Sequence, residues 1–465
     1  MIKLFRVSVP GSVLVMLLGD ILLLVFCYLL PVLWTEELPL AEFLWADNGA
    51  LQIGLVIVVL IAGLYLSDLY EHFRKQSITA VVQQLCLIQG VELLIQSLLS
   101  YVRSPLVSSK WTMLYGSIGA LILLPLWRRL FTKLVARRKG GAKILFVGSS
   151  PMVQEIVKEL HDRPEIGLRA AGYVDRKRDE TAESLGLVYL GQPEELPQVT
   201  AAQDPERLIV SMRSDTPNSS ANFPVEQLLD QQFTGRRIER VSTIYESIFG
   251  RVSIKDLQAE DLIFSFEPNH FAEQLQAVYS IVLAAFGFLI TLPIMLLVGV
   301  AVKVTSTGPV LFRQTRVGKN KRLFVLYKFR SMRVDAEAKT GAVWATKNDP
   351  RITPIGGILR KLRLDELPQF INVIRGDMSL VGPRPERPEF VEMLENKIPF
   401  FRQRMSVKPG ITGWAQINHK YGDTVEDTVT KLEYDLYYIK NMTPSLDAYV
   451  IFHTAKVMLL SRGAQ

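Results

Sequence analysis

Long apolar segments separated by short polar ones dominate the first part of the chain. They cover residues 9–33, 51–66, 78–101 and 111–127. A helix needs about 20 apolar residues to cross the hydrocarbon core of a bilayer, and these segments are close to that length. The first is too long for the core of a signal peptide and lacks a clear cleavage site. The pattern therefore predicts a four-helix transmembrane domain over residues 1–140.

The third segment is the least apolar of the four. It carries Gln83, Gln84, Gln89, Glu92 and Gln96. Polar side chains inside a bilayer usually face other helices or a cavity. We therefore expect contacts between helices at these positions, with a ligand site among them as the alternative.

The charges between the apolar segments indicate their orientation. Residues 34–50 contain acidic side chains and no Lys or Arg, whereas the next connection carries Arg74 and Lys75 and the third carries Arg103 and Lys110. A dense basic run over residues 128–139 follows the fourth segment. Because Lys and Arg collect on the cytoplasmic side, both ends of the four-helix domain are predicted to face the cytoplasm.

Short apolar runs alternate with helical patterns over residues 141–250. The run Lys143–Val147 indicates a buried strand, and a helical stretch follows Gly148-Ser149-Ser150. Further strands are expected at Arg169–Val174, Leu187–Leu190, Arg207–Ser211 and Ile238–Val241. Such alternation is typical of a doubly wound parallel sheet, here an α/β Rossmann-like middle domain. The glycine set G-x-G-x-x-G is incomplete, so the domain is either a nucleotide-binding domain or a degenerate scaffold or regulatory domain.

A fifth apolar run, residues 278–302, contains no charged side chain and has Pro293 inside it. Its length alone predicts an ordinary fifth span. A span here would place the rest of the chain outside the cell. Pro293 removes one hydrogen bond of the helix and permits a kink there.

The chain after residue 309 has the pattern of a soluble, strongly basic domain. Strands are expected at Val310–Arg313 and Leu323–Phe329, around a turn at Gly318-Lys319-Asn320. Residues 389–405 mix large apolar side chains with arginines, which suits either a helix on the membrane surface or one that faces the core. Residues 433–460 predict one or two helices broken at Pro444.

Composition supports a membrane protein that handles anions. The chain has 465 residues, 49% of them hydrophobic, with a formal net charge of +7. A basic balance suits nucleic acid, an anionic membrane or phosphorylated substrates. The basic run beside a membrane helix favours the membrane, so no nucleic-acid partner is expected. Cys27 and Cys86 lie in apolar segments and are expected to be inert thiols.

The strongest candidate for chemistry is Asp365-Glu366, which follows a basic patch containing Arg360 and Arg363. Adjacent residues in a helix point about 100° apart, so the two carboxylates have separate targets. One can attack phosphorus as a nucleophile, the other can hold a hard divalent cation, and arginines can clamp phosphate oxygens. The alternative is a solvated helix end held by salt bridges.

The residues around this pair resemble the polyprenyl-phosphate hexose-1-phosphate transferases, the bacterial sugar transferase family. The resemblance covers residues 274 to the C-terminus. The matching motifs are Gly308-Pro309-Val310-Leu311-Phe312, Gln314-Thr315-Arg316-Val317-Gly318, Lys328-Phe329-Arg330-Ser331-Met332, Asp365-Glu366-Leu367-Pro368-Gln369, Gly382-Pro383-Arg384-Pro385 and Lys408-Pro409-Gly410-Ile411-Thr412-Gly413-Trp414.

The resemblance implies a mainly α, monotopic catalytic domain over residues 251–465, with residues 278–302 as a re-entrant membrane helix. It implies transfer of a sugar 1-phosphate from a nucleotide diphosphate sugar, such as a UDP-hexose, to undecaprenyl phosphate. This reaction would start exopolysaccharide, capsule or O-antigen assembly at the cytoplasmic face of the bacterial inner membrane. The resemblance to the large members of this family also implies a homodimer.

The family pattern assigns a role to each matching residue. Asp365 would be the nucleophile that carries the phosphosugar, and Glu366 would bind Mg²⁺. The other expected catalytic residues are Lys328, Arg360 and Arg384. The expected substrate-binding residues are Arg316, Arg330, Gln369 and Pro383.

Two other functions fit parts of the pattern. A membrane-bound nucleotide-sugar dehydratase or epimerase would also join membrane helices to a Rossmann domain, but it needs an intact glycine set and a Tyr-x-x-x-Lys pair. A silent membrane scaffold for polysaccharide export would not need the intact Asp365-Glu366 pair.

Overall fold

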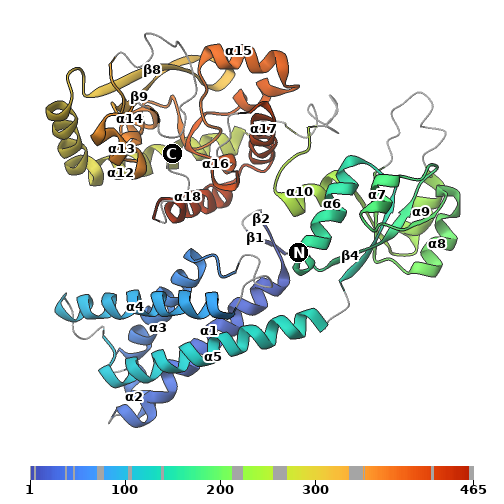
Figure 1. Ribbon diagram of the computed structural model, residues 1–465, viewed down its shortest axis with the longest axis horizontal. Helices are drawn as coiled ribbons and strands as arrows, with labels where there is room; N and C mark the ends of the chain where they lie inside the picture. Colours follow the sequence, from blue (N-terminus) through green and yellow to red (C-terminus); the bar gives the residue numbers. More distant parts are fainter. Residues whose placement is uncertain are drawn as a thin grey trace. The chain divides into compact units, whose positions relative to one another are not determined.

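The computed structural model describes residues 2–4, 7–36, 39–45, 48–70, 78–102, 107–137, 141–211, 224–254, 266, 270–334, 349, 351–419 and 424–459. The chain forms two compact units (Figure 1). Residues 8–240 belong to the first unit and residues 241–465 to the second, with the first seven residues divided between them. The predicted cytoplasmic location of Met1 and Gln465 falls outside the described residues.

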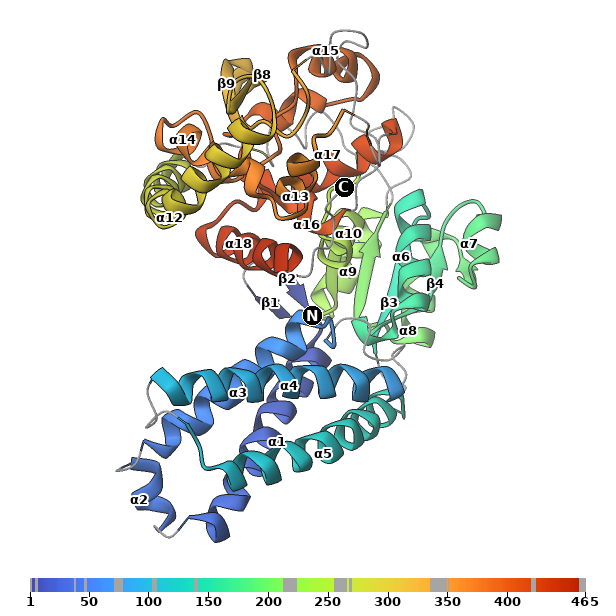
Figure 2. The same cartoon turned by 60° about the vertical axis from the view of Figure 1, so that its left-hand side comes forward.

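The chain begins with strands β1 (Ile2–Leu4) and β2 (Val7–Val9), which the two units share, and the first unit continues into a helical bundle. Its long helices are α1 (Gly11–Thr35), α3 (Gly49–Leu66), α4 (Ile78–Val102) and α5 (Lys110–Arg137), with the short helix α2 (Leu40–Trp45) between α1 and α3. Helices α1 and α4 each pack against α3 and α5 (Figure 2). All four predicted segments are helices that are long and apolar enough to cross a membrane.

A buried ion pair ties α1 to α5. Arg128 donates to Asp20 at 2.6 Å and to the carbonyl of Leu69 at 2.9 Å, and the hydroxyl of Tyr70 donates to the same carboxylate at 2.9 Å. The sequence placed Arg128 in a basic run beyond the fourth helix. That placement was wrong for this residue, because α5 continues to Arg137 and buries Arg128.

The polar face of α4 turns into the bundle. Tyr28 of α1 donates to Gln89 at 3.3 Å and its hydroxyl lies 3.2 Å from that of Ser117 of α5. Glu92 and Gln96 are buried one and two turns further along α4. The expected contacts between helices are confirmed at Gln89.

The middle of the chain folds into a five-stranded parallel sheet in the order β5-β4-β3-β6-β7. The central strand β3 (Ala142–Val147) is fully buried over its last four residues, which explains its unbroken apolar run. The other strands are β4 (Leu168–Val174), β5 (Tyr189–Gly191), β6 (Arg207–Val210) and β7 (Arg237–Arg240). The helices are α6 (Pro151–Asp162), α7 (Glu180–Ser184), α8 (Leu196–Gln203) and α9 (Val225–Phe233), so the predicted doubly wound sheet is confirmed.

The second unit starts with α10 (Val241–Phe249), and the residues after it dock onto its core. The carbonyl of Gly250 accepts from Trp414 Nε1 at 2.7 Å, and the amides of Val252 and Ile254 both donate to Glu433 at 3.1 Å. These contacts anchor residues 250–254 in the second unit.

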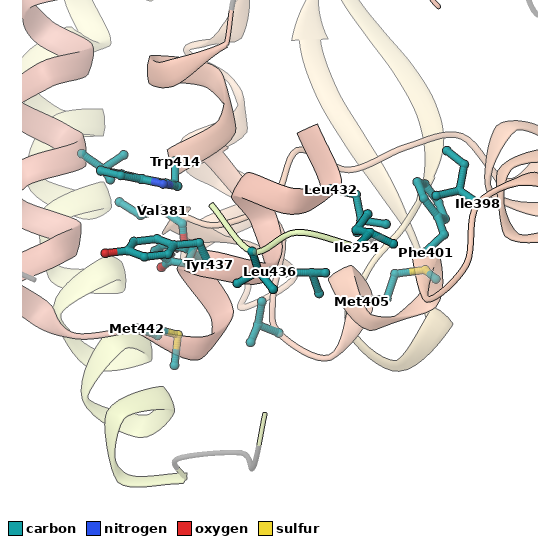
Figure 3. Packing of buried hydrophobic residues seen from close by; sticks show 14 of the residues in the cluster. Ile254, Val381, Ile398, Phe401, Met405, Trp414, Leu432, Leu436, Tyr437 and Met442 are labelled. Atoms are coloured by element: carbon teal, nitrogen blue, oxygen red, sulfur yellow. Dashed lines mark hydrogen bonds between the residues drawn. The ribbon is translucent and has the colours of Figure 1, made fainter. Parts of the chain in front are cut away.

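A hydrophobic cluster holds the second unit together (Figure 3). It joins α15 (Pro388–Lys397), η6 (Phe401–Met405), α16 (Trp414–Asn418), α17 (Val425–Lys440) and α18 (Pro444–Leu459). Leu394, Ile398 and Phe401 are each 1% exposed in this cluster. Residues 389–405 therefore face the core, and their interpretation as a membrane-surface helix is wrong. The predicted break at Pro444 is confirmed.

The fifth apolar run lies in one continuous helix, α12 (His270–Thr305), with Pro293 inside it. Gln276 near its start donates to Asp447 of α18 at 2.7 Å and to Tyr438 of α17 at 2.6 Å. Val298 and Val302 near its end pack against Phe329 and Leu359. One face of α12 thus contacts the second unit at both ends. The large apolar side chains exposed elsewhere on the helix include Val278, Val282, Phe286, Leu289, Leu296 and Val300.

Candidate active site

A β-hairpin presents the first basic residue of the site. Strands β8 (Leu311–Val317) and β9 (Leu323–Phe329) pair antiparallel, and β8 extends four residues past its predicted end. Asn372 of α14 (Gln369–Ile374) holds the edge of β9, because its side chain accepts from the amide of Tyr327 at 3.1 Å and donates to the carbonyl of Val325 at 2.7 Å. Lys328 is the next residue of β9 after Tyr327, so the contacts of Asn372 help to fix the backbone that carries it.

A tight backbone turn places the carboxylate pair. Helix α13 (Pro354–Lys361) begins at Thr353, whose hydroxyl accepts from the amide of Gly356 at 3.1 Å. Two residues after α13 ends, Arg363 adopts φ +57°, which is uncommon for a residue with a side chain. The chain then enters the short helix η5 (Leu364–Glu366), so both acidic residues lie immediately after a sharp change of direction.

Glu366 is surrounded by cations. Its Oε1 accepts from Lys328 at 3.0 Å and from Arg384 at 3.1 Å, and Arg363 lies 3.8 Å away. Burial alone would raise the pKa of Glu366, but these cations outweigh it and hold the pKa well below the usual range. Glu366 is therefore an ionised anchor for the basic residues.

Asp365 has the opposite surroundings. It is 6% exposed, and its Oδ1 has no hydrogen-bond partner among the residues that the structure describes. Burial raises the pKa of Asp365 and the charge of Glu366 adds to this, while Lys328, Arg360 and Arg384 oppose it. A buried oxygen without a donor is a costly feature in a folded protein and a usable one in a nucleophile.

Lys328 connects the two carboxylates electrostatically. Burial lowers its pKa and the charge of Arg384 lowers it further, whereas Glu366 and Asp365 favour the charged ammonium. Because Lys328 interacts with both acids, a single cation can stabilise negative charge that develops beside Asp365.

The loop that carries Arg384 leaves a small parallel sheet. Strand β10 (Ser379–Val381) pairs with β11 (Gly410–Thr412), and the amide of Gly382 donates to the carbonyl of Thr412 at 2.9 Å. A Cβ at Gly382 would lie 2.5 Å from the carbonyl oxygen of Lys408, so only glycine fits this close approach. The described peptide bonds are trans, including those that precede Pro383 and Pro385.

Two of the expected substrate-binding residues, Arg316 and Arg330, form hydrogen bonds within the protein. Arg316 donates to the carbonyl of Pro385 at 3.0 Å and to Gln314 at 2.6 Å. Arg330 donates to the carbonyl of Ser306 at 2.9 Å and to its hydroxyl at 2.6 Å, which ties β9 to the end of α12. These contacts show a structural role for both arginines, and substrate binding by them stays a prediction.

The remaining predicted residues lie around the carboxylate pair. Arg360 in the last turn of α13 is near enough for its charge to favour ionisation of Asp365. Gln369 is buried at the start of α14, and its Nε2 has no partner among the described residues. Pro383 lines a small hollow next to Arg384, together with Gly318 and other residues.

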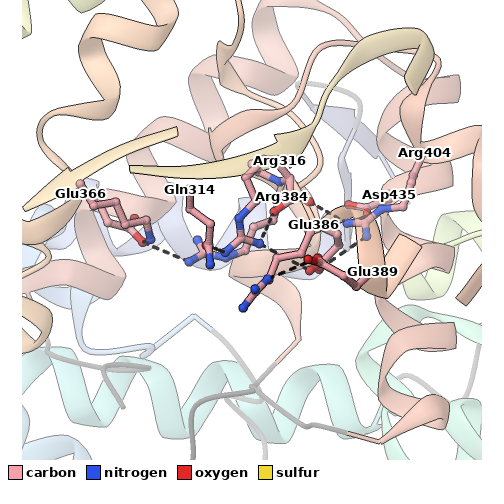
Figure 4. Close-up of polar contacts among 11 residues, drawn as sticks. Gln314, Arg316, Glu366, Arg384, Glu386, Glu389, Arg404 and Asp435 are labelled. Atoms are coloured by element: carbon pink, nitrogen blue, oxygen red, sulfur yellow. Dashed lines mark hydrogen bonds and ion pairs between the residues drawn. The ribbon is translucent and has the colours of Figure 1, made fainter. Parts of the chain in front are cut away.

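Sequence reasoning missed Arg404, which contacts the Arg384 loop, and its partner Asp435 (Figure 4). Arg404 of η6 donates to Asp435 of α17 at 3.1 Å and to the backbone carbonyl of Arg384 at 3.0 Å. Burial raises the pKa of Asp435 to about 6, against the opposing charge of Arg404. Their only sequence signal was a charged residue inside an otherwise apolar stretch, which does not identify a partner 31 positions away.

The two carboxylates suit Mg²⁺ only in company with a substrate. Within the described part of the chain there is no group of three His, Cys, Asp or Glu residues that could hold a metal ion. Mg²⁺ sites in proteins commonly use one or two carboxylates plus substrate phosphates. Asp365 and Glu366 fit that kind of site, with Asp365 Oδ1 still available.

The turn between β3 and α6 in the middle domain is filled by carboxylates. Asp175 accepts from the amide of Ser149 at 2.7 Å. Asp179 accepts from the hydroxyl of Ser149 and from Gln154 at 2.8 Å, and it also caps α7. In dinucleotide-binding sheets the amides of this turn face a pyrophosphate.

Two family models match parts of the chain. Residues 271–461 match the family model described as "Bacterial sugar transferase", and residues 65–218 match one described as "CoA-binding domain". The middle domain does not fit a bound diphosphate in this structure, because Asp175 and Asp179 bind the amide and the hydroxyl of Ser149 and would repel an anion there.

Several curated relatives are similar to the chain. A "UDP-glucose:undecaprenyl-phosphate glucose-1-phosphate transferase" of Xanthomonas campestris pv. campestris is 33% identical over 77% of this chain and 75% of its own length. A relative from Klebsiella pneumoniae with the same name is 32% identical over 74% of each chain. A "UDP-N-acetylgalactosamine-undecaprenyl-phosphate N-acetylgalactosaminephosphotransferase" of Aeromonas hydrophila is 43% identical over 49% of this chain and about half (53%) of its own length.

The two family models match residues 65–218 and 271–461, and the motifs that carry Lys328, Glu366 and Arg384 meet at one site in the second unit. The chain is a membrane protein that belongs to the bacterial sugar transferase family.

Proposed function

We propose that this protein transfers a sugar 1-phosphate from a nucleotide diphosphate sugar, such as a UDP-hexose, to undecaprenyl phosphate and so initiates polysaccharide assembly. The observation that carries the proposal is the difference between the two adjacent carboxylates. Glu366 is paired with cations, whereas Asp365 keeps a buried oxygen without a donor. The names of the relatives support the class of donor and acceptor.

The proposed reaction has two displacement steps. In the first, a carboxylate oxygen of Asp365 attacks the phosphorus that bears the sugar, and the bond from this phosphorus to the bridging oxygen breaks. The nucleoside monophosphate leaves with that oxygen. In the second step a phosphate oxygen of the lipid attacks the same phosphorus, the bond to Asp365 breaks, and the free carboxylate is restored.

Fixed positive charge supplies most of the catalytic help in this scheme. Lys328 and Arg384 lie within 3.1 Å of Glu366, next to the nucleophile, and Arg360 adds a further positive charge. A transferred phosphoryl group spreads its charge over its outer oxygens, so cations already in place stabilise it without reorganising. Glu366 is the residue that would hold Mg²⁺, which when bound would neutralise part of the donor's diphosphate charge.

We propose that α12 is re-entrant, so that the active site stays at the cytoplasmic face. Packing supports this proposal, because Gln276 near one end and Val302 near the other contact the same folded unit. A helix crossing the bilayer would have to separate two such contacts by about 30 Å of hydrocarbon. The homodimer expected for large members of the family also stays a proposal.

The alternative of a dehydratase or epimerase is not favoured. It needs a nucleotide at the β3–α6 turn, and the donors of that turn are bound by Asp175 and Asp179. The relatives are instead named as phosphotransferases.

Release of nucleoside monophosphate tests the proposal. Purified protein in lipid particles is mixed with Mg²⁺ and each member of a panel of UDP-sugars, with and without undecaprenyl phosphate. The proposal predicts sustained release of UMP with one or a few donors, and only when the lipid is present. UMP release that does not respond to the lipid, or no release with any donor, would contradict it.

A further inference from the structure

Three consecutive carbonyls of the Arg384 loop are each held by a donor from another part of the second unit. Gly410 donates its amide to the carbonyl of Pro383 at 3.0 Å. Arg404 donates to that of Arg384 at 3.0 Å, and Arg316 to that of Pro385 at 3.0 Å. Because proline has no amide N–H, two of these three residues cannot be fixed through their own donors, and the carbonyl contacts take over that role.

The middle contact depends on a buried ion pair. Arg404 is 8% exposed and Asp435 2% exposed. Arg404 donates from Nε to Oδ2 of Asp435 at 3.1 Å, and its Nη2 lies 2.9 Å from the same oxygen. Its Nη1 lies 3.6 Å from Glu386 (Figure 4). Asp435 lies on α17 beside the fully buried Leu436, so this carboxylate stands on a rigid helix.

We propose that Arg404 and Asp435 are positioning residues that set the place of the Arg384 guanidinium at the active site. The pair would act through the backbone of Arg384 and would touch neither substrate. The proposal deepens the proposed function, since it assumes that Arg384 stabilises the transferred phosphoryl group.

The shape of the guanidinium explains why an arginine is needed at position 404. Its planar fork reaches the carboxylate of Asp435 and the carbonyl of Arg384 at the same time. A lysine keeps the charge but has one compact ammonium on a flexible stem, so it cannot hold both acceptors in fixed directions. A displacement of about 1 Å in a catalytic group can cost about 100-fold in rate.

The test compares single and double variants in the first half-reaction. The rate of phosphosugar adduct formation with donor alone is measured for wild type, Arg404→Lys, Asp435→Asn, Arg384→Ala and the double variant Arg384→Ala with Arg404→Lys. Arg402→Gln is the matched control, because Arg402 lies exposed in the same short helix η6. Hydrogen exchange of peptides covering residues 382–387 gives a readout that needs no turnover.

We expect Arg404→Lys and Asp435→Asn to lower the maximal rate about 10- to 100-fold with little change in donor KM. In the Arg384→Ala background the Arg404→Lys change should add less than about twofold, because the residue it positions is already gone. Hydrogen exchange over residues 382–387 should be faster in Arg404→Lys and in Asp435→Asn, and unchanged in Arg402→Gln. Independent, multiplicative losses in the double variant, or wild-type rates in both single variants, would overturn the proposal.

Different results would overturn the proposed function and the positioning role of Arg404 and Asp435. If wild type forms no adduct and releases no nucleoside monophosphate with donor and lipid, the proposed function fails, while faster exchange in Arg404→Lys would still support the positioning role of Arg404. If wild type reacts but hydrogen exchange of residues 382–387 is the same in every variant, Arg404 and Asp435 do not position Arg384, and the proposed function stands. Asp435→Asn is nearly isosteric, so it keeps the test decisive should Arg404→Lys not fold.

Discussion

Two neighbouring carboxylates in one short helical turn have different partners. Lys328 and Arg384 both donate to Glu366, which fixes its charge and its direction. Asp365 is buried beside them with an oxygen that receives no donor from the described residues. Glu366 therefore organises the basic residues, and Asp365 remains available to react.

The pH dependence of adduct formation should report Asp365. A nucleophilic carboxylate must be ionised, so kcat/KM for the donor should fall as the pH drops through its pKa. Burial and Glu366 raise that pKa, so the fall should occur at a higher pH than for an ordinary aspartate. Lys328→Met removes a charge that lowers the pKa and should move the fall to higher pH, whereas Glu366→Gln should move it to lower pH. Shifts in the same direction would contradict this assignment.

The motifs allowed much of the site to be predicted. Asp365, Glu366, Lys328 and Arg384 lie together as expected, because each belongs to a dense local pattern. Arg404 and Asp435 could not be found in this way. Their role comes from a contact between a short helix and α17, and a single sequence contains no signal for such a pairing.

At the scale of elements, α12 would keep a soluble-like unit at the membrane if the helix is re-entrant, as proposed above. Its contacts with the catalytic unit occur near both ends, and many large apolar side chains elsewhere on it are exposed. This arrangement suits a helix that carries the unit on one leaflet.

Labelling of the two ends of α12 tests that arrangement. Phe271 and Val304 are both exposed, near the start and the end of the helix. Each is changed to cysteine in a protein from which Cys27 and Cys86 have been removed. A membrane-impermeant thiol reagent added to intact cells should label neither position, and both should react after permeabilisation. Labelling of only one end in intact cells would indicate a complete span.

The ion pair in the bundle should be strongly coupled. Asp20→Ala would leave Arg128 buried without its 2.6 Å partner, and breaking such a pair costs about 3–5 kcal/mol. The midpoint of thermal unfolding in detergent should fall markedly. Adding Arg128→Met should recover most of the loss, because no uncompensated charge remains. Exposed Arg129→Met serves as the control and should change little. Additive losses at Asp20 and Arg128 would contradict the coupling.

Periodicity predicted most elements to within a few residues, and its errors have physical causes. Helix α5 passes its expected end at Trp127 because Arg128 finds a buried carboxylate. Strand β8 continues to Val317 because pairing with β9 sustains it through polar positions. Whether residues 389–405 lie on a membrane or in a core depends on tertiary packing, which the pattern does not contain.

At the scale of the whole molecule, the middle domain has the fold of a nucleotide-binding domain without an open phosphate turn. Titration of the full-length protein with CoA or NAD should show no binding at micromolar concentrations, because Asp175 and Asp179 hold the donors of the turn. Replacing both with asparagine removes the repulsion and should only then permit weak binding of anions. Stoichiometric CoA or NAD on the purified wild-type protein would show that this description of the domain is wrong.

The central claim is that one carboxylate carries the sugar phosphate between the two substrates. Intact-protein mass spectrometry after mixing enzyme, Mg²⁺ and donor without lipid tests it most directly. The account predicts an added hexose-phosphate mass that maps to Asp365, disappears when undecaprenyl phosphate is added, and is absent in Asp365→Asn. Full turnover by Asp365→Asn, or an active wild type that never shows the adduct and needs both substrates bound together, would contradict it.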